Sequence, residues 1–148
     1  MSNGPLAGYP IEAMKVRLFH GSFHDVDSDA LSFELAARLG FKEAAKKATP
    51  VLMEPIMAVE ITTPDEFTGS VTGDLNRRRG IMKGMEIKSN AQIVKADVPL
   101  AELFGYVTDL RTITSGRAAA SLTFSHYEKI PKNLAESIVE NAQGAAAK

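Results

Sequence analysis

The sequence predicts an α+β protein whose larger part is a ferredoxin-like split β-α-β domain. After residue 48 the patterns follow the order strand, helix, strand, strand, helix, strand, which is the order of that fold. Both helices are amphipathic, so we expect them to cover one face of an antiparallel sheet and to leave the other face available. Residues 1–48 predict an incomplete α/β piece, residues 49–131 the ferredoxin-like domain, and residues 132–148 a C-terminal helix and tail.

The incomplete piece contains one predicted strand and one predicted helix. Apolar and basic side chains alternate over residues 14–20, as in a half-buried strand. Apolar residues at helical spacing predict a helix over residues 29–48, with Ser28 as its N-cap. One strand and one helix do not close a core, and a lone strand leaves its backbone edges unpaired. We therefore expect the other strands of this domain to lie upstream.

The larger part opens with a strand that leads directly into a helix. Met57, Val59 and Ile61 alternate with more polar residues and share one face of the strand. Residues 63–66, Thr-Pro-Asp-Glu, predict a capping box with proline at the first helical position. The helix is therefore expected to begin at residue 64.

This first helix of the larger part has an apolar stripe and two glycines. Phe67, Val71 and Leu75 lie at helical spacing and are expected to be buried. Gly69 and Gly73 carry no Cβ, so we expect them to let the helix backbone approach the sheet closely.

The remaining elements are predicted from alternation and from proline and glycine signals. Residues 80–87 and 91–98 predict two strands joined by a polar turn at residues 88–90. A second helix is expected over residues 99–114, with Gly116 ending it. The last strand is predicted by the alternating apolar residues Ala120, Leu122 and Phe124. A final amphipathic helix is predicted after Pro131 by Leu134, Ile138 and Val139, and it is expected to dock back before residues 143–148 fray.

Composition restricts the classes of function. Seventeen basic residues (Lys+Arg) against eighteen acidic ones (Asp+Glu) give a formal net charge of -1, so any nucleic-acid contact must come from local patches. The absence of cysteine excludes disulfides, thiolate catalysis and Cys-ligated zinc. The sequence has no leader pattern and no apolar run long enough to span a bilayer, so we expect a cytoplasmic protein without a membrane partner.

The phosphate-binding pattern Gly-x-x-x-x-Gly-Lys-Ser/Thr does not occur in these residues. Nucleotide hydrolysis by such a loop needs the glycine-rich backbone, the lysine and the magnesium-binding hydroxyl at fixed spacing. We therefore expect no catalytic residues, no cofactor and no GTP hydrolysis in this chain alone.

His24 is followed by a run of acidic residues that are potential metal ligands. They are Asp25, Asp27 and Asp29. Their spacing begins like a calcium loop, but Ala30 replaces the turn glycine and Ala36 replaces the bidentate glutamate, so no metal is expected there by that pattern. Three interpretations of His24 stay open: a zinc or general-acid site, a polar loop that caps the following helix, or a projecting imidazole that stacks on a base or contacts a phosphate.

Residues 73–80 read Gly-Asp-Leu-Asn-Arg-Arg-Arg-Gly, which is a cationic helix end closed by a glycine. As structure, the arginines suit the negative end of the helix dipole and Gly80 can take a left-handed cap. As function, the guanidinium groups of Arg77, Arg78 and Arg79 match phosphate oxygens. Arg117, just before the last strand, could likewise contact a partner or simply lie on an edge.

Several motifs, in one order, resemble bacterial elongation factor G. They lie at residues 4–10, 24–28, 52–57, 73–80, 90–92, 98–106 and 125–133. The resemblance implies that the incomplete piece is the end of domain IV, with a ribosomal protein S5 domain 2-like fold, and that the larger part is domain V. It implies a ribosome-binding module that supports GTP-dependent translocation of tRNA and mRNA. GTP and magnesium belong to the missing N-terminal GTPase domains of that ribosome-stimulated family.

The resemblance also implies candidate RNA- and ribosome-binding residues. In the tip loop they are His24, Asp25, Asp27 and Ser28, which would lie beside tRNA at the decoding site. In the larger part they are Asn76, Arg77, Arg78, Arg79 and Arg117, which would face ribosomal RNA and proteins of the large subunit.

Two other functions are compatible with parts of this pattern. A standalone split-sheet hydrolase of phosphate esters or acyl phosphates would use the arginines to bind phosphate and Asn76 to orient water. A ribosome-protection paralogue would share the architecture but should differ at the tip loop. The sequence of residues 24–28 favours translocation.

Overall fold

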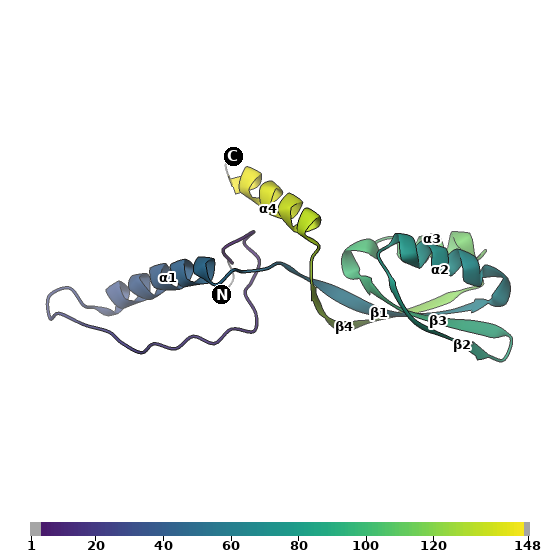
Figure 1. Cartoon of the computed structure of the whole chain (residues 1–148), viewed down its shortest axis with the longest axis horizontal. Coiled ribbons are helices and arrows are strands. Elements are labelled where there is room, and N and C mark those ends of the chain that lie inside the picture. Colours follow the sequence, from purple (N-terminus) through teal and green to yellow (C-terminus); the bar gives the residue numbers. More distant parts are fainter. Residues whose placement is uncertain (1–3, 147–148) are drawn as a thin grey trace. The chain divides into compact units, whose positions relative to one another are not determined.

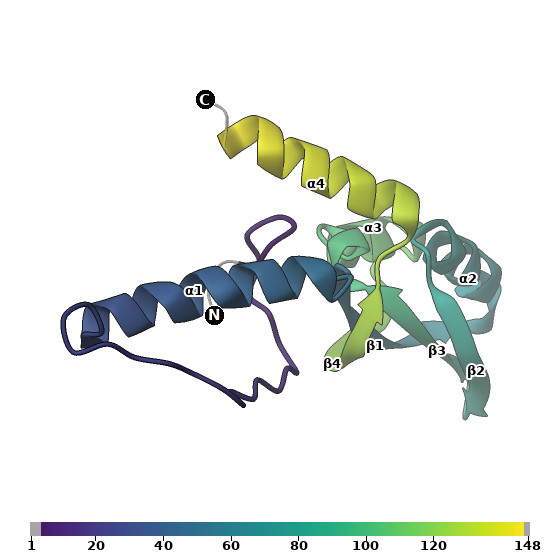
Figure 2. The ribbon, with the colours of Figure 1, turned by 60° about the vertical axis from the view of Figure 1, so that its left-hand side comes forward.

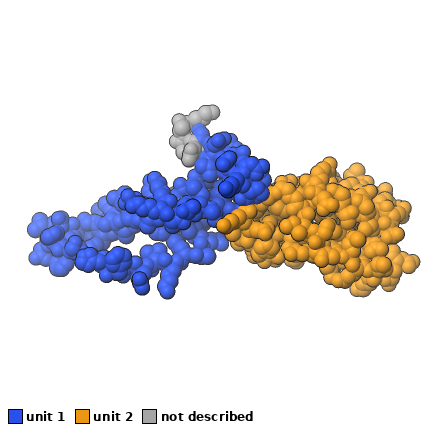
Figure 3. Space-filling model, in the orientation of Figure 1, with its two compact units in different colours: residues 1–52, 130–148 blue, residues 53–129 orange. Residues whose placement is uncertain are grey.

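The computed structural model describes residues 4–146. Its elements, in chain order, are α1 (Ala30–Lys47), β1 (Met53–Pro64), the 3-10 helix η1 (Asp65–Phe67), α2 (Thr68–Arg77), β2 (Ile81–Lys88), β3 (Ala91–Pro99), the 3-10 helix η2 (Leu100–Glu102), α3 (Tyr106–Ile113), β4 (Ala119–Lys129) and α4 (Lys132–Ala146) (Figure 1). The chain divides into two compact units (Figure 3). One is residues 53–129, and the other is residues 1–52 together with residues 130–148.

The unit of residues 53–129 has the predicted ferredoxin-like fold. Its four strands form one antiparallel sheet in the order β2-β3-β1-β4, and β1 pairs with both β3 and β4. The helices α2 and α3 lie on the same face of this sheet (Figures 1 and 2). The strands predicted at residues 80–87 and 91–98 are confirmed as β2 and β3, with a turn between them in which Ser89 has a φ of 57°.

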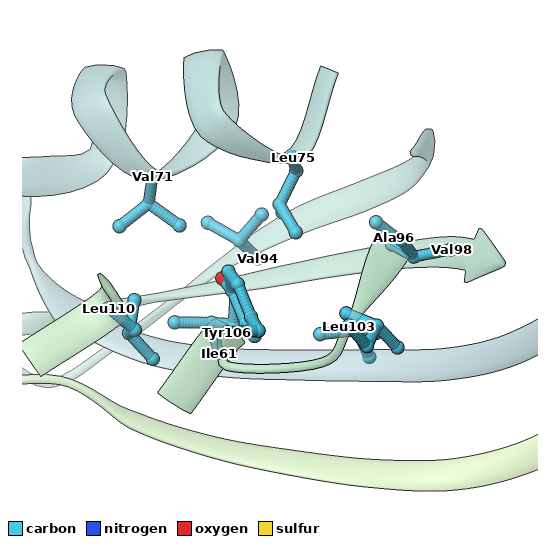
Figure 4. Close-up of a cluster of buried hydrophobic side chains, with 10 residues drawn as sticks. Ile61, Val71, Leu75, Val94, Ala96, Val98, Leu103, Tyr106 and Leu110 are labelled. Atoms are coloured by element: carbon cyan, nitrogen blue, oxygen red, sulfur yellow. The ribbon is translucent and has the colours of Figure 1, made fainter. Parts of the chain in front are cut away.

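The core of this unit lies between the sheet and its two helices (Figure 4). Its buried residues are Val59, Ile61, Val71, Leu75, Val94, Ala96, Val98, Leu103, Tyr106 and Leu110. The apolar stripe predicted for α2 is confirmed, because Val71 and Leu75 are fully buried and Phe67 packs against the cluster. Each large apolar side chain buried in this way stabilises the fold by about 1.5–3 kcal/mol.

The predicted capping box is wrong because β1 continues further than its alternation indicated. Thr63 lies in the strand opposite Gln92 and is fully buried. Its hydroxyl bonds the carbonyl oxygen of Pro64 at 3.4 Å, so it caps no helix. A 3-10 turn, η1, then precedes α2, and no side chain caps its N-terminus.

The glycines of α2 have different roles from those predicted. Gly69 and Gly73 are exposed, and a Cβ added at either would meet no atom within 4 Å, so they permit no close approach to the sheet. Gly80 is the tight position, because a Cβ there would lie 2.6 Å from the carbonyl oxygen of Leu75. The left-handed cap is taken by Arg79, with a φ of 61°, and not by Gly80.

The second predicted helix is interrupted. Residues 100–102 form η2, Gly105 adopts a φ of 77°, and α3 begins only at Tyr106. The left-handed glycine breaks the run of helical hydrogen bonds, and Leu103 and Tyr106 on either side of it both enter the core. The predicted end is confirmed: Gly116 has a φ of 75° and its N–H donates to the carbonyl oxygen of Arg111 at 2.8 Å.

In the other unit, the predicted helix over residues 29–48 is confirmed as α1, but the predicted strand over residues 14–20 is not formed. These residues are irregular and exposed, and no described strand pairs with them. Their backbone N–H and C=O groups therefore lack the partners that a neighbouring strand would supply. The N-cap of α1 is Asp29 and not Ser28, since an Asp29 carboxylate oxygen accepts the N–H of Ser32 at 2.7 Å.

The predicted C-terminal helix is present as α4 and continues to Ala146, and the fraying predicted from residue 143 stays a prediction. Residues 147 and 148 lie outside the described part of the chain. No described helix is both long and apolar enough to cross a membrane.

Candidate nucleic-acid interface

The tip loop of residues 24–28 is closed by hydrogen bonds between its first and last residues. The N–H of His24 donates to Ser28 Oγ at 2.8 Å, and the N–H of Ser28 donates to the carbonyl oxygen of His24 at 3.1 Å. Ser28 Oγ also donates to Asp27 Oδ1 at 3.1 Å. These bonds form a tight turn in which His24, Asp25 and Asp27 are exposed and Ser28 is half-buried. The structure therefore brings the four predicted tip residues together.

The tip loop is acidic. No lysine or arginine lies between Arg17 and Arg38, whereas Asp25 and Asp27 flank the exposed tip. At the start of α1, hydrogen bonds from Ser32 lower the pKa of Asp29 and keep its carboxylate charged. Carboxylates accept hydrogen bonds and repel phosphate, so this loop is suited to donors such as base amino groups and ribose hydroxyls.

The three consecutive arginines at the end of α2 lie in different environments. The side chain of Arg77 is 75% exposed, that of Arg78 13% and that of Arg79 29%. The cap explains this divergence: the N–H of Arg79 donates to the carbonyl oxygen of Asn76 and that of Gly80 to the carbonyl oxygen of Leu75, which reverses the chain at Arg79. The first arginine of the run is therefore the one that is mainly exposed.

Asp74 is a buried carboxylate that accepts hydrogen bonds from two of these arginines. Its side chain is 4% exposed, its Oδ2 accepts Arg78 Nε at 2.8 Å, and its Oδ1 accepts Arg77 Nη2. Burial raises the pKa of Asp74, but the hydrogen bonds and charges of Arg78 and Arg77 outweigh that effect, so the pKa lies below its ordinary value. The group is a carboxylate anion at neutral pH.

Arg78 connects α2 to the segment that follows β3. Its Nη1 donates to the carbonyl oxygen of Glu102 at 2.7 Å, and its Nη2 pairs with Asp109 on α3. The guanidinium carbon lies 5.0 Å from the ring centroid of Tyr106. Burial lowers the pKa of Arg78, but its bonds to Asp74 and Asp109 raise it further than burial lowers it. Every described contact of this guanidinium is internal, so the structure places Arg78 inside the fold.

Arg79 connects the same helix end to β1. Its Nη1 donates to Glu54 Oε2 at 3.1 Å and its Nη2 pairs with the other oxygen of that buried carboxylate. A weaker pair joins it to Glu102 at 3.9 Å. The hydrogen bonding of Arg79 to the Glu54 carboxylate is the largest effect on the pKa of Arg79 and raises it. Such a two-pronged pair is geometrically specific, which fits a structural role.

The other predicted contacts of the larger unit are exposed. Asn76 lies beside Arg77 at the surface. Arg117 is 54% exposed, pairs with Glu66 at 2.7 Å and lies 4.6 Å over the ring of Phe67. The structure thus presents Asn76 and Arg77 together at the end of α2, and Arg117 separately near η1.

Sequence reasoning missed the carboxylates that pair with the arginines and determine which of them are exposed. Asp74 could have been found, because it lies three and four residues before Arg77 and Arg78, the spacing at which helical side chains meet. Glu54 and Asp109 carried no such signal, since they are distant in sequence from the arginines they bind.

The residues do not fit the GTP and magnesium that the resemblance attributes to the full-length family. The chain contains no phosphate-binding loop of the required pattern. Within residues 4–146, no three His, Asp or Glu side chains are grouped so as to hold a metal ion.

Two family models match the chain. The model of the elongation factor G C-terminus matches residues 51–138, and the model of elongation factor G, domain IV, matches residues 1–49. Among solved structures, a crystal structure of a Thermus thermophilus protein is 42% identical, with a TM-score of 0.88, and the match covers 96% of this chain and 22% of that one.

Curated relatives are similar over nearly all of the chain. Elongation factor G of Amoebophilus asiaticus (strain 5a2) is 78% identical over 148 residues, which is 100% of this chain and 21% of the relative. The same factor of Cytophaga hutchinsonii is 74% identical over 99% of the chain and 21% of the relative, and that of Aquifex pyrophilus is 56% identical over 94% and 20%. The chain therefore spans about a fifth of the length of the curated relatives it matches.

Proposed function

The chain belongs to the elongation factor G family, and from that premise we propose that it is a ribosome-binding module that supports GTP-dependent translocation of tRNA and mRNA. In this proposal residues 1–48 act as the end of domain IV, residues 49–131 as domain V, and residues 132–148 as the C-terminal helix and tail. The partners are the ribosome and the GTPase domains of the same factor. The module acts in the cytoplasm, where ribosomes are.

The observation that carries the proposal is the exposed guanidinium of Arg77, next to Asn76, at the end of α2. Arginine is suited to phosphate oxygens. A helix surface that carries an exposed guanidinium, with Nε and Nη1 not bonded to any described residue, and a neutral amide can contact an RNA backbone without reading its sequence. Arg78 and Arg79 support this contact from inside the fold, and Arg117 is a second, separate contact.

The tip loop is proposed to act differently. Its carboxylates and His24 project from a turn that Ser28 closes, and the acidic charge favours contacts to base and ribose donors over contacts to phosphate. In an intact factor, such a loop would occupy the decoding site beside the moved tRNA and oppose its return.

We further propose that this chain does not hydrolyse GTP itself and that GTP and magnesium bind the other domains of the whole factor. The support is the absence of the phosphate-binding pattern from its sequence. A GTPase assay of the purified chain with and without ribosomes tests this, and turnover by the chain alone would refute it.

Ribosome binding across a salt series tests the RNA contact. We expect the binding constant of the chain to fall steeply with salt, and Arg77→Met to lower the slope of log K against log salt by about one. Lys95→Met is the control: it also removes one paired cation, which is half-buried. Lys95 lies on the sheet face away from α2, because its neighbours Val94 and Ala96 face the core. Equal effects of both changes, or no salt dependence, would contradict the proposal.

The tip loop is tested in an intact factor that carries this region. His24→Ala is expected to slow translocation while ribosome-stimulated GTP hydrolysis stays at its normal rate, because the nucleotide is proposed to bind other domains. Equal loss of both activities would contradict the assignment of His24 to the decoding site.

A further inference from the structure

We infer that Asp74 is the positioning residue of the RNA contact: it holds the Arg77 guanidinium at the surface in one orientation, and Arg78 in turn holds Asp74. This inference rests on the proposed ribosome binding through Arg77. It concerns a buried group that would not itself touch RNA, since the side chain of Asp74 is only 4% exposed.

Asp74 restrains Arg77 without using up its donors. Arg77 gives Nη2 to Asp74 Oδ1, while its Nε and Nη1 make no hydrogen bond to any described residue. A free arginine side chain has rotamer entropy to lose when it is fixed by a ligand. A guanidinium that is already fixed at one nitrogen loses less of it on binding a phosphate oxygen.

Asp74 is itself held on its other oxygen. Oδ2 accepts Arg78 Nε at 2.8 Å, and Arg78 is fixed by Asp109, by the Glu102 carbonyl oxygen and by the ring of Tyr106. Three segments of the fold, α2, η2 and α3, therefore determine where this carboxylate lies. The hydrogen bond from Arg77 Nη2 to this carboxylate therefore fixes the exposed guanidinium of Arg77 relative to the same three segments.

The opposite role is physically possible and gives the opposite result. A carboxylate beside an arginine can compete with phosphate for it, in which case removal of the charge would tighten RNA binding. The fixed geometry of Asp74 and the two unused donors of Arg77 favour positioning over competition.

A double-mutant cycle in an intact factor separates these roles. Ribosome dissociation constants are measured over a salt series for the parent, Asp74→Asn, Arg77→Met and the double variant, at a temperature where thermal melts show all four folded. We expect Arg77→Met to raise Kd about tenfold, with a salt slope lower by about one. Asp74→Asn should raise Kd about threefold with an unchanged slope, and the double variant should match Arg77→Met alone.

The possible results of the cycle separate the inference about Asp74 from the proposed RNA contact of Arg77. Additive effects in the cycle would show that Asp74 acts on binding independently of Arg77 and would overturn the inference, as would tighter binding by Asp74→Asn. A normal Kd and slope for Arg77→Met would refute the proposed RNA contact itself, which is a different failure.

Arg78→Lys keeps the inference testable if Asp74→Asn does not fold. An ammonium keeps the charge beside Asp74 but cannot hold Asp74, Asp109 and the Glu102 carbonyl together. We expect Kd to rise about threefold with the salt slope unchanged, because Arg78 contacts no phosphate in this arrangement. An unchanged Kd, or a slope lower by about one, would overturn the inference.

Discussion

The helices α1 and α2 form for different reasons. α1 has 18 residues, a capped start at Asp29, basic residues in its last turn and ion pairs such as Glu34 with Arg38, yet it buries none of its residues. α2 has 10 residues, two exposed glycines and no side-chain cap, yet it buries Val71 and Leu75 completely. Isolated helices shorter than about 12–15 residues are marginal in water, so α2 depends on its core. α1 buries no residue, so its local features, the cap and the ion pairs, are the stabilising contacts that the structure shows.

The sharpest test of this difference is the removal of one leucine from each helix. Leu75→Ala should lower the free energy of unfolding by about 3 kcal/mol, because it leaves a cavity in a packed core. Leu35→Ala on α1, where the side chain is 52% exposed, should change it by less than about 0.5 kcal/mol. Chemical denaturation of the chain, followed by circular dichroism, measures both. Equal losses would show that α1 packs against something that its exposure does not reveal.

A second comparison sets a buried carboxylate against an exposed one. Asp74→Asn should cost about 2 kcal/mol at pH 7, because it weakens charge-assisted hydrogen bonds in a buried site. Glu34→Gln, whose partner Arg38 lies at 2.6 Å on the surface of α1, should cost less than about 0.5 kcal/mol.

The pH dependence of the Asp74 effect follows from the lowered pKa. Because the folded-state pKa lies below the ordinary value of 3.8, the stabilisation is complete above that pH and is lost as the pH falls through the folded-state pKa. The difference between the parent and Asp74→Asn should therefore shrink below pH 3.8. A difference that grows on acidification would show that burial, and not the arginines, dominates this carboxyl group.

The same contrast explains which features could be read from the sequence. The strands and helices of residues 53–129 were predictable because their apolar periodicity matches a core that exists within the unit. The strand predicted at residues 14–20 has the same periodicity, but no described strand pairs with it. The capping box predicted at Thr63 was wrong for a related reason. The capping pattern is local in sequence, whereas Thr63 pairs with Gln92 on another strand.

The residues of the candidate site could be predicted from the sequence, but the structural role of each arginine could not. The arginine run and the tip loop stand out in the sequence, and the fold does expose Arg77 and His24. The engagement of Arg78 and Arg79 in internal pairs depends on Glu54 and Asp109, which lie on other elements. No spacing rule connects those positions, so only the fold could separate the exposed arginine from the internal ones.

Glycine substitutions should have opposite signs in the two regions. Gly80→Ala should lower the free energy of unfolding by about 1–2 kcal/mol, because the new Cβ would lie 2.6 Å from the Leu75 carbonyl oxygen and the cap would have to open. Gly40→Ala, inside α1 with no atom within 4 Å, should stabilise that helix by up to about 1 kcal/mol. Denaturation midpoints and helical circular dichroism report the two effects. A harmless Gly80→Ala would show that the cap at Arg79 is not constrained by its neighbour.

The smallest effect is expected at Tyr106, where the core carries a polar group that it does not use. The hydroxyl is buried without a hydrogen-bond partner among the described residues, and burial, with the nearby charge of Asp74, raises the pKa of Tyr106 and keeps it neutral. Tyr106→Phe keeps the ring beneath Arg78 and removes the unpaired hydroxyl, so stability should be unchanged or higher by up to about 1 kcal/mol. Tyr9→Phe, at an exposed tyrosine of the other unit, should have no effect. Because an unpaired hydroxyl can only cost stability, a clear loss in Tyr106→Phe would mean that a bound water satisfies it, and the core beside Asp74 would then be wetter than the packing indicates.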